Sequence, residues 1–338
     1  MNTPQKALQE KDIRPTNDAS QAEQKRRYES DVARMLARRS EFVDVACPAC
    51  GSQERRPRFE KLTLTYPECV GCGTVYVSPR PPPDVLREYY EKSENYAYWN
   101  AVIFPQSEAV RRERIFRPRV ERLVELCKRN GVAQGTLVEV GSGFGTFCEE
   151  LKATGAFRRV LAVEPTPDLA ETCRKRGVEV IEKRIEDARI DEPVDVVASF
   201  EVIEHLFEPA TFIEACRQML RPDGLVVLTC PNVRGFDVEV LGTASPAVDA
   251  EHLNYFHPAS LGLLLERHGF AVVESQTPGK LDVDIVRNRL LAGDVEITDR
   301  FLRRILLEDF ERVGASFQDF LVANGLSSNM WIAARKSS

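Results

Sequence analysis

The chain has 338 residues, enough for one large domain or two smaller ones, each with its own core. Hydrophobic residues make up 43% and charged residues 29%, and 46 basic against 52 acidic side chains give a formal net charge of −6. This balance argues against a long nucleic-acid groove, which needs clustered positive charge. No apolar run approaches the ~20 residues that span a bilayer, and the polar start MNTPQKALQEKD lacks the pattern of a signal peptide. We therefore expect a cytoplasmic protein with no membrane span and no nucleic-acid partner.

The first part of the chain divides into three segments. Residues 1–45 predict a polar tail and a charged surface helix over 21–40. Residues 46–83 form a cysteine-rich module that ends in a proline run. Residues 84–130 combine an aromatic stretch, YYEKSENYAYWN, with a basic helix over about 111–129. We interpret this third segment as a lid or linker before a large domain over 131–338.

The cysteine-rich module contains two Cys-x-x-Cys pairs, Cys47 with Cys50 and Cys69 with Cys72, separated by eighteen residues. This spacing is typical of a four-thiolate zinc ribbon. A redox motif would need only one such pair beside a helix start. Because cysteine fills all four positions, the zinc ion is expected to stabilise the module and to leave no open site for catalysis.

From residue 131 onward, short apolar runs alternate with amphipathic helical patterns. The runs lie at 137–140, 160–163, 194–198, 225–229 and 271–273. This alternation predicts βαβ units and a largely parallel sheet. Residues 284–323 interrupt it with Phe and Leu at helical spacing, which predicts a helical insertion before the last strand, MWIAAR. We expect this insertion to cover the active site or to form a homodimer contact, with burial against its own sheet as the alternative.

The stretch LVEVGSGFGTF, in the first of these strands and the turn after it, predicts a ligand-binding turn. Gly141, Gly143 and Gly145 would let the backbone turn sharply and approach a ligand. The spacing is neither G-x-G-x-x-G nor that of a P-loop. The next strand, VLAVEP, ends in Glu164, an acid that could accept both hydroxyls of a ribose.

With these motifs in order, residues 110–338 resemble class I S-adenosylmethionine-dependent methyltransferases. VEVGSGFGTF resembles their motif I, VLAVEP motif II, and SFEVIEH the motif after the fourth strand. The similarity is greatest to ubiquinone-type O-methyltransferases and related zinc-ribbon methyltransferases, which residues 47–92 also resemble. The resemblance implies an α/β, Rossmann-like, seven-stranded, mostly parallel sheet with helices on both faces, and S-adenosylmethionine as cofactor.

The resemblance also implies the cofactor-binding residues. The methionine part and ribose would lie along Glu139, Gly141, Ser142, Gly143 and Gly145. The ribose hydroxyls would contact Glu164, which Pro165 follows, and the adenine would contact Ile185 and Glu186. The sulfonium would lie over Phe200 and Glu201. The carboxylate of the cofactor would be held by Arg112 or Arg117.

Four histidines are candidates for the general base that a hydroxyl acceptor needs. His252, in the loop after the fifth strand, is expected to be the base or a substrate ligand, with Asn254 and Tyr255 as further substrate contacts. His205 is the second candidate. The resemblance also allows a divalent metal near Glu201, Glu204 and His205, with capping or packing as the alternative. His257 and His268 are interpreted as structural and surface residues.

These features predict in-line methyl transfer to a hydroxyl of a small molecule or sugar, in a glycan or secondary-metabolite pathway. The alternatives are a C-methyltransferase acting on a nucleotide-linked sugar, an RNA methyltransferase whose ribbon grips nucleic acid, and a non-catalytic cofactor-binding protein. No Asn-Pro-Pro-Tyr or Asp-Pro-Pro-Tyr follows the fourth strand, which argues against a base amine as acceptor. Five aromatic residues are expected either to form a wall for a sugar ring or to pack within the protein without contacting a ligand: Tyr89, Tyr90, Tyr96, Tyr98 and Trp99.

Overall fold

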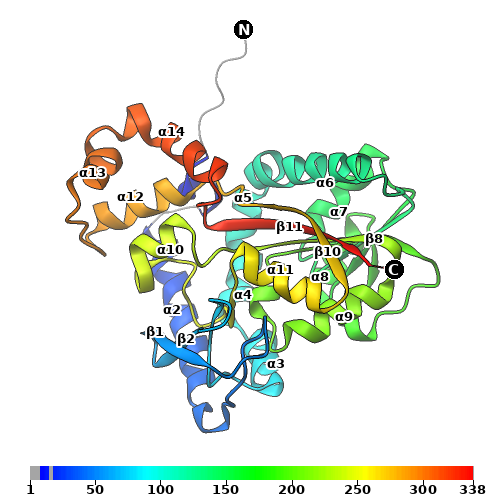
Figure 1. Cartoon of the computed structure of the whole chain (residues 1–338), viewed down its shortest axis with the longest axis horizontal. Helices are drawn as coiled ribbons and strands as arrows, with labels where there is room; N and C mark the ends of the chain where they lie inside the picture. The colour runs from blue at the N-terminus through cyan, green and yellow to red at the C-terminus, as the bar shows by residue number, and fades with distance from the viewer. Residues whose placement is uncertain (1–7, 15–17, 338) are drawn as a thin grey trace.

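A seven-stranded sheet forms the centre of the molecule (Figure 1), which the computed structural model describes over residues 8–14 and 18–337. The strand order is β10-β11-β8-β7-β4-β5-β6; the strands from β8 to β6 run parallel, and β11 is antiparallel to both neighbours. In chain order the strands are β4 (Thr136–Val140), β5 (Arg159–Val163), β6 (Glu179–Ile181), β7 (Val194–Phe200), β8 (Leu220–Pro231), β10 (Phe270–Gln276) and β11 (Asn329–Lys336). The mostly parallel sheet predicted from the apolar runs is confirmed.

Helices cover both faces of this sheet, because side chains along each strand alternate between two apolar cores. In β4, Leu137 belongs to one core and the next residue, Val138, to the other. The first core is covered by α6 (Arg117–Arg129), α7 (Thr146–Thr154) and α8 (Pro167–Lys175), and the second by α9 (Pro209–Met219) and α11 (Pro258–Arg267). The predicted arrangement, with helices on both faces, is therefore confirmed.

A second, smaller sheet joins the cysteine-rich module to the large domain. Its order is β1-β2-β3-β9, with β1 (Arg55–Lys61), β2 (Leu64–Cys69), β3 (Val75–Tyr76) and β9 (Asn254–Tyr255). Strand β9 belongs to the loop after β8, and its Tyr255 pairs with Val75 of β3. The module therefore shares a sheet with the loop that carries His252.

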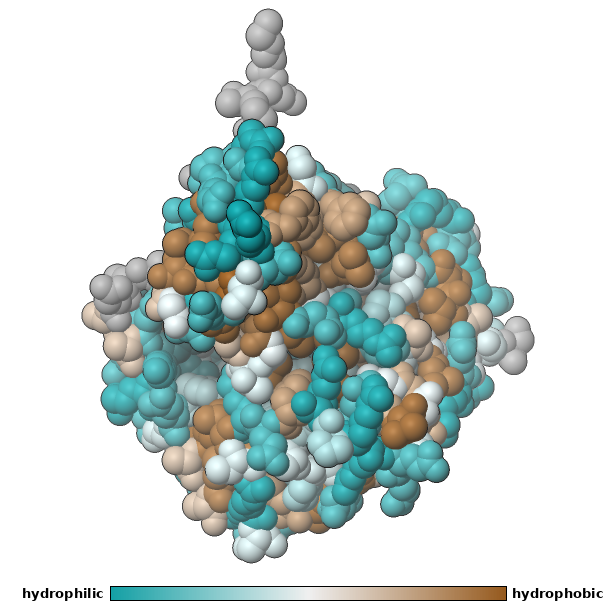
Figure 2. All heavy atoms as spheres, turned by 60° about the vertical axis from the view of Figure 1, so that its left-hand side comes forward, coloured by the Kyte–Doolittle hydropathy of each residue, from teal (hydrophilic) through white to brown (hydrophobic). Residues whose placement is uncertain are grey.

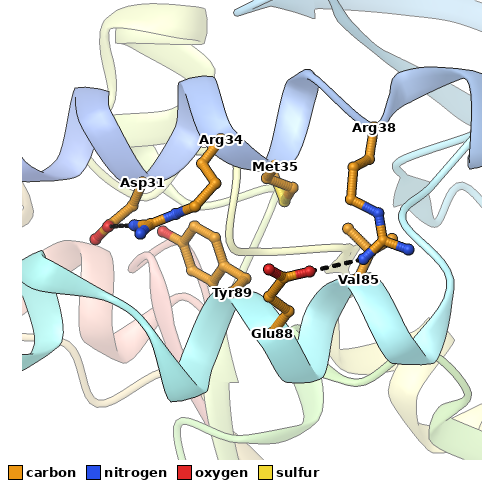
Figure 3. A pocket seen from close by; sticks show the side chains of 7 residues that line it. All are labelled: Asp31, Arg34, Met35, Arg38, Val85, Glu88 and Tyr89. Atoms are coloured by element: carbon orange, nitrogen blue, oxygen red, sulfur yellow. Dashed lines mark hydrogen bonds and ion pairs between the residues drawn. The ribbon is translucent and has the colours of Figure 1, made fainter.

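The N-terminal helix α2 (Asp18–Leu36) packs on α3 (Pro83–Glu91), as Figure 3 shows. Met35 lies between the two helices beside Val85, and Arg38 forms an ion pair with Glu88 at 2.8 Å. The space left between the helices is only about 10 Å³, enough for about one water molecule and no ligand. One side of α2, which was predicted as a surface helix, is thus buried. The polar tail predicted before it lies partly outside the described residues.

A chain of short helical segments leads from α3 to α6. It comprises α4 (Glu94–Tyr98), the π-helical η2 (Trp99–Ile103), α5 (Phe104–Arg111) and the π-helical η3 (Arg112–Phe116). Asp31 of α2 fixes its start, because its buried carboxylate accepts hydrogen bonds from Ser93 Oγ at 2.7 Å and from two backbone N–H groups of α4. The remaining short elements are α1 (Glu10–Ile13), η1 (Arg39–Glu41), η4 (Ile185–Asp187), η5 (Ile203–His205), α10 (Phe236–Leu241) and η6 (Gly242–Ala244).

The predicted insertion before the last strand is helical and stands apart from the main sheet (Figure 1). It contains α12 (Asp282–Ala292), α13 (Arg300–Arg303), η7 (Arg304–Glu308) and α14 (Phe310–Ala323). Its apolar side chains form a separate core with Leu241 of α10. Phe301 and Phe320 stay 67% and 53% exposed, and Figure 2 shows apolar side chains among charged ones on this part of the surface. The predicted dimer contact or lid stays a prediction. Among the described residues, no helix combines the length and apolar character needed to cross a bilayer.

Candidate functional site

The turn between β4 and α7 needs glycine at two positions. Gly141 and Gly145 have φ values of 72° and 70°, a region that side-chain-bearing residues rarely adopt. A Cβ on Gly141 would lie 2.5 Å from a methyl of Val202, and one on Gly145 would lie 2.8 Å from Cys173 Sγ. The backbone of this loop is therefore packed too closely for any larger residue, as a turn that cradles a ligand requires.

Two buried carboxylates flank this glycine loop. Glu164, at the end of β5, accepts hydrogen bonds from the backbone N–H groups of Gly143 at 2.9 Å and Thr166 at 3.0 Å. Glu139 lies inside β4 and accepts a hydrogen bond from Cys148 Sγ at 3.0 Å. Burial raises the pKa of both, that of Glu139 to about 8. Ser142, within the loop, is also buried and lies 3.5 Å from Cys173 Sγ.

The residues predicted around the adenine lie on η4, after β6. Ile185 is buried in the core beneath the sheet, whereas Glu186 is partly exposed and pairs with Arg184 at 3.4 Å. Pro165 follows Glu164 on the same edge of the sheet. The predicted cofactor residues from β4, β5 and β6 thus lie on loops that follow three adjacent parallel strands.

At the end of β7, Glu201 adopts a positive φ of 57° and its side chain is held from three sides. Glu201 Oε1 accepts hydrogen bonds from Thr229 Oγ1 at 2.6 Å and Asn329 Nδ2 at 3.1 Å, and it pairs with Arg119 at 3.6 Å. The Arg119 guanidinium also lies 4.3 Å from the centre of the Phe200 ring, a cation–π contact.

Arg119 is a further candidate for the site, on the helix where the sequence favoured Arg112 or Arg117. The two arginines predicted to bind the cofactor carboxylate are already held by glutamates: Arg112 pairs with Glu149 and Glu150, each at 2.7 Å, and Arg117 pairs with Glu150 at 2.8 Å. Arg119 extends from α6 so that its guanidinium lies at the end of β7, and burial lowers the pKa of Arg119. The signal was helical periodicity, since Arg119 precedes the buried Leu123 by one turn and shares its face of α6.

Helix α5 lies against the glycine loop. The ring of Phe104, at the start of α5, stacks on that of Phe144 in the loop, with centroids 3.7 Å apart and planes 8° apart. The segment predicted as a lid or linker is therefore in contact with the predicted cofactor loop.

A second group of side chains converges near the predicted acceptor side. Ligand atoms of Glu204, His205 and His252 all lie within 4.8 Å of one another, and the two imidazole rings are 4.6 Å apart. Glu204 Oε2 is buried and has no hydrogen-bond partner among the described residues, and burial raises the pKa of Glu204 well above its usual range. Glu201, which the sequence analysis grouped with Glu204 and His205, is not part of this cluster; its side chain accepts a hydrogen bond from Thr229 instead.

Hydrogen bonds fix the tautomers of the two histidines. His252 Nδ1 lies 2.8 Å from the carbonyl oxygen of Ala247, and His205 Nδ1 lies 3.2 Å from that of Glu251. Because a carbonyl can only accept, Nδ1 carries the proton in each neutral ring, and the lone pair is on Nε2. Burial lowers the pKa of His205 well below 6.5, which keeps this ring neutral.

Three of the predicted aromatic residues surround this cluster. Tyr89 and Tyr96 donate hydrogen bonds to the two carboxylate oxygens of Glu251, at 2.6 Å and 2.9 Å. Tyr90 Oη lies 3.2 Å from His205 Nδ1. Tyr98 and Trp99 instead contact the guanidinium groups of Arg27 and Arg111. The aromatic stretch is thus divided between the cluster and helix packing.

Two residues expected near the substrate are structural. Asn254 is buried, and its Nδ2 donates to the carbonyl oxygen of Leu206 at 2.7 Å. Tyr255 is also buried and donates to the carbonyl of Asp249 at 3.1 Å. His257, expected to be structural, caps α11 and donates from Nε2 to the carbonyl of Cys72 at 2.8 Å. His268 ends the same helix.

The four cysteines of the module form a compact cluster of free thiols. Their Sγ atoms lie within 4.8 Å of one another, with Cys47 and Cys72 3.5 Å apart and Cys50 and Cys69 3.4 Å apart. Tetrahedral zinc with Zn–S bonds of about 2.3 Å requires sulfurs roughly 3.8 Å apart. The donor set and its spacing therefore fit a zinc ion after small adjustments.

The parallel sheet with its antiparallel strand β11, the glycine turn after β4 and the carboxylate at the end of β5 are the features of a class I S-adenosylmethionine-dependent methyltransferase. Residues 109–275 match the family model Methyltransf_23, described as a methyltransferase domain. Residues 109–275 therefore form a methyltransferase domain of this class, whose cofactor is S-adenosylmethionine.

Similar proteins include both O- and C-methyltransferases. The ubiquinone biosynthesis O-methyltransferase of Xylella fastidiosa is 28% identical over 163 residues, covering 44% of this chain and 65% of the relative. The C-methyltransferase NovU of Streptomyces niveus is 31% identical over 168 residues, covering 47% of this chain and 38% of the relative. A solved O-methyltransferase of a Brevibacillus brevis polyketide multienzyme, in complex with S-adenosyl-L-homocysteine, has a TM-score of 0.45 and 15% identity, covering 69% of this chain and 76% of that one.

Proposed function

We propose that the protein transfers the methyl group of S-adenosylmethionine to a hydroxyl of a small molecule or sugar, with His252 as the general base. The observation that carries this proposal is the hydrogen bond from His252 Nδ1 to the carbonyl of Ala247. It leaves the basic Nε2 free beside His205, in the loop after β8 at the carboxyl edge of the sheet, where ligands bind in this architecture.

The cofactor would lie across the ends of β4, β5 and β7. The glycine loop with Ser142, together with Glu139, would pack along its methionine part, and Glu164 with Pro165 would meet the ribose. Ile185 and Glu186 would lie at the adenine. Of the three arginines, Arg119 is the best placed for the carboxylate, because its guanidinium lies over Phe200 at the end of β7 and its ion pair with Glu201 is long, at 3.6 Å. Arg112 and Arg117 instead pair closely with Glu150, at 2.7 Å and 2.8 Å. Arg119→Gln should therefore weaken cofactor binding measured by calorimetry, and Arg112→Gln should not.

The cofactor supplies a methyl group bonded to a positively charged sulfur, which makes the carbon open to in-line attack. His252 Nε2 would accept the proton of the acceptor hydroxyl while the oxygen forms its bond to the methyl carbon and the carbon–sulfur bond breaks. Glu251, fixed by Tyr89 and Tyr96, holds the backbone next to His252. This positioning is the main contribution that a methyltransferase makes to the rate.

His205 is the second candidate for the base. Its Nε2 also carries the lone pair, but the pKa of His205 is lowered by burial, which weakens it as a proton acceptor. The same three side chains, Glu204, His205 and His252, offer an alternative role as ligands of a divalent cation. Turnover that disappears after treatment with a chelator and returns with Mg²⁺ or Mn²⁺ would favour that alternative.

Methylation at carbon of a nucleotide-linked sugar is the second candidate function. The similarity to the C-methyltransferase NovU, at 31% identity, favours it. Carbon methylation also needs a base, so His252 keeps its role in both schemes. Release of S-adenosyl-L-homocysteine with phenolic, sugar and nucleotide-sugar acceptors would identify the substrate. The NMR spectrum of the product would then distinguish the two functions, because it shows whether the new methyl group is bonded to oxygen or to carbon.

We also propose that Cys47, Cys50, Cys69 and Cys72 hold one zinc ion. The close approach of their Sγ atoms supports this assignment, and the all-cysteine set gives the ion a structural role. It would hold together a module whose own strands are short, and which packs on the loop carrying His252.

A further inference from the structure

A groove lies between the cysteine-rich sheet and the connection from β8 to α10, outside the predicted cofactor site. It encloses about 310 Å³, at the lower end of the ~300–1,000 Å³ of typical small-molecule sites. Arginines dominate its wall, which is formed by Arg56, Arg58, Glu68, Gly73, Val75, Val233, Arg234 and Glu239. The two valines that line it are buried.

Arg234 is the unpaired cation of this groove. Within residues 8–14 and 18–337, its guanidinium has no hydrogen-bond or ion-pair partner, although it lies against the backbone of Gly73. A Cβ on Gly73 would come within 2.3 Å of Arg234 Nη2, so glycine is needed for the guanidinium to occupy this place. The positive φ of Gly73, 75°, independently favours glycine there.

Two further arginines approach the groove from β1. Arg56 and Arg58 both line the groove, and Arg58 lies in a β-bulge between Pro57 and Phe59 that interrupts the regular alternation of the strand. Arg56 Nη2 donates to Glu68 at 2.8 Å, and Arg58 Nη2 donates to Glu239 at 3.1 Å. Each guanidinium has five N–H donors, so each keeps several free for a ligand.

This arrangement differs from that of the basic helix predicted over residues 111–129. There, Arg112 and Arg117 meet glutamates, and Arg122 pairs with Glu274 at 2.9 Å. In the groove, three guanidinium groups face two carboxylates, which leaves one positive charge without an opposite partner. Among the described residues, the groove therefore holds a guanidinium without an ion-pair partner, that of Arg234, whereas these three arginines of the helix are paired.

We propose that this groove binds the phosphoryl group of a small molecule, as a monophosphate or diphosphate. Planar guanidinium groups recognise phosphate oxygens through paired hydrogen bonds, and three of them can surround one such group. The small volume and the flanking glutamates disfavour a long polyanion. The inference does not depend on methyl transfer, because none of these residues belongs to the proposed cofactor or acceptor site.

The test is a calorimetric titration of the full chain with inorganic diphosphate at constant ionic strength. We expect saturable binding to one site, and Arg234→Gln to weaken it at least about tenfold, as loss of one charge-assisted hydrogen-bonding partner should. Glu239→Gln should tighten binding, because the carboxylate that competes for Arg58 becomes neutral. Arg87→Gln, which removes an exposed arginine of α3 outside the groove, is the matched control and should bind as wild type.

Titrations with a nucleoside diphosphate and with inorganic phosphate distinguish whether the bound phosphoryl group belongs to an organic compound or to a free phosphate. Tighter binding of the nucleoside diphosphate, lost in Arg234→Gln, would identify an organic phosphoryl compound, and equal binding would identify free phosphate or diphosphate. Diphosphate binding that Arg234→Gln and Arg87→Gln reduce equally would overturn the proposal. So would the absence of saturable binding, or an RNA oligonucleotide that binds wild type more tightly than diphosphate does and loses this binding in Arg234→Gln. Thermal unfolding of each variant checks that it is folded.

Discussion

Arg80 Nη1 donates a hydrogen bond to Asn254 Oδ1 at 3.1 Å in the interior of the protein. The same guanidinium also donates to the carbonyl oxygens of Phe207 at 2.8 Å and Leu253 at 3.3 Å. This buried cation has no carboxylate partner among the described residues, and burial lowers the pKa of Arg80 to about 10. Arg80 therefore connects the end of the cysteine-rich module to the two loops that carry His205 and His252.

Replacing Arg80 with Met should strongly destabilise the protein. The substitution removes the guanidinium that donates to the carbonyls of Val77 and Phe207 and to Asn254 Oδ1, and each acceptor left unsatisfied costs about 1–3 kcal/mol. We expect a fall in the thermal unfolding temperature of several degrees or more. The control is Arg87→Met, on the exposed side of α3, which should change stability by no more than about 0.5 kcal/mol. Equal unfolding temperatures for the two variants would contradict the role given to Arg80.

Glu164→Ala should weaken binding of S-adenosylmethionine by roughly tenfold to hundredfold, because the ribose hydroxyls lose a charged acceptor worth about 1.5–3 kcal/mol. Titration calorimetry measures this directly. Glu182→Ala, which changes a glutamate after β6 that pairs with Arg174, is the control and should bind normally. An unchanged dissociation constant for Glu164→Ala would remove Glu164 from the ribose site.

His205 should make stability depend on pH. Its pKa in the folded protein lies well below 6.5, so the unfolded chain binds more protons at mildly acidic pH. The free energy of unfolding should therefore be fully retained above about pH 6.5 and fall below it, by up to about 1.4 kcal/mol per pH unit. Urea unfolding of wild type and His205→Asn from pH 7.5 to 5 checks this, since the variant should show a smaller slope. His268→Asn, at the end of α11, should keep the wild-type slope.

Purified protein should contain one zinc ion per chain, and Cys69→Ser should lose it and unfold at a lower temperature. Elemental analysis measures the metal, and thermal unfolding measures the stability. Cys216→Ser, a buried cysteine of α9 outside the cluster, should keep its zinc. Wild-type protein without zinc, prepared without chelators, would refute the assignment.

Most of the sheet could be predicted from the sequence because β4, β5, β7 and β8 contain continuous apolar runs separated by amphipathic helices. The three-residue strand β6, which begins with the exposed Glu179, was not among these runs. The pairing of β9 with β3 could not be predicted, since a two-residue strand leaves no periodicity to detect. The meeting of Glu204 with His252 was likewise hidden, because it depends on how the loops after β7 and β8 pack. The inward position of Arg119 could be predicted, because it lies one turn before the buried Leu123. The roles expected for Arg112 and Arg117 rested on the family resemblance alone, and the sequence did not show that Glu149 and Glu150 lie beside them. The sequence also did not show that Asn254 is buried and that its side-chain amide donates to backbone carbonyls, which leaves it no contact with a substrate.

The turnover of His252→Ala tests the central claim most directly. With an acceptor identified from the panel, release of S-adenosyl-L-homocysteine should fall by roughly 10²–10⁴-fold, while calorimetry shows unchanged affinity for S-adenosylmethionine. His257→Ala, which removes the cap of α11, is the control for general disturbance and should retain most of the turnover per folded molecule. Near-normal turnover by His252→Ala would contradict the account and place the base elsewhere, with His205 the next residue to test.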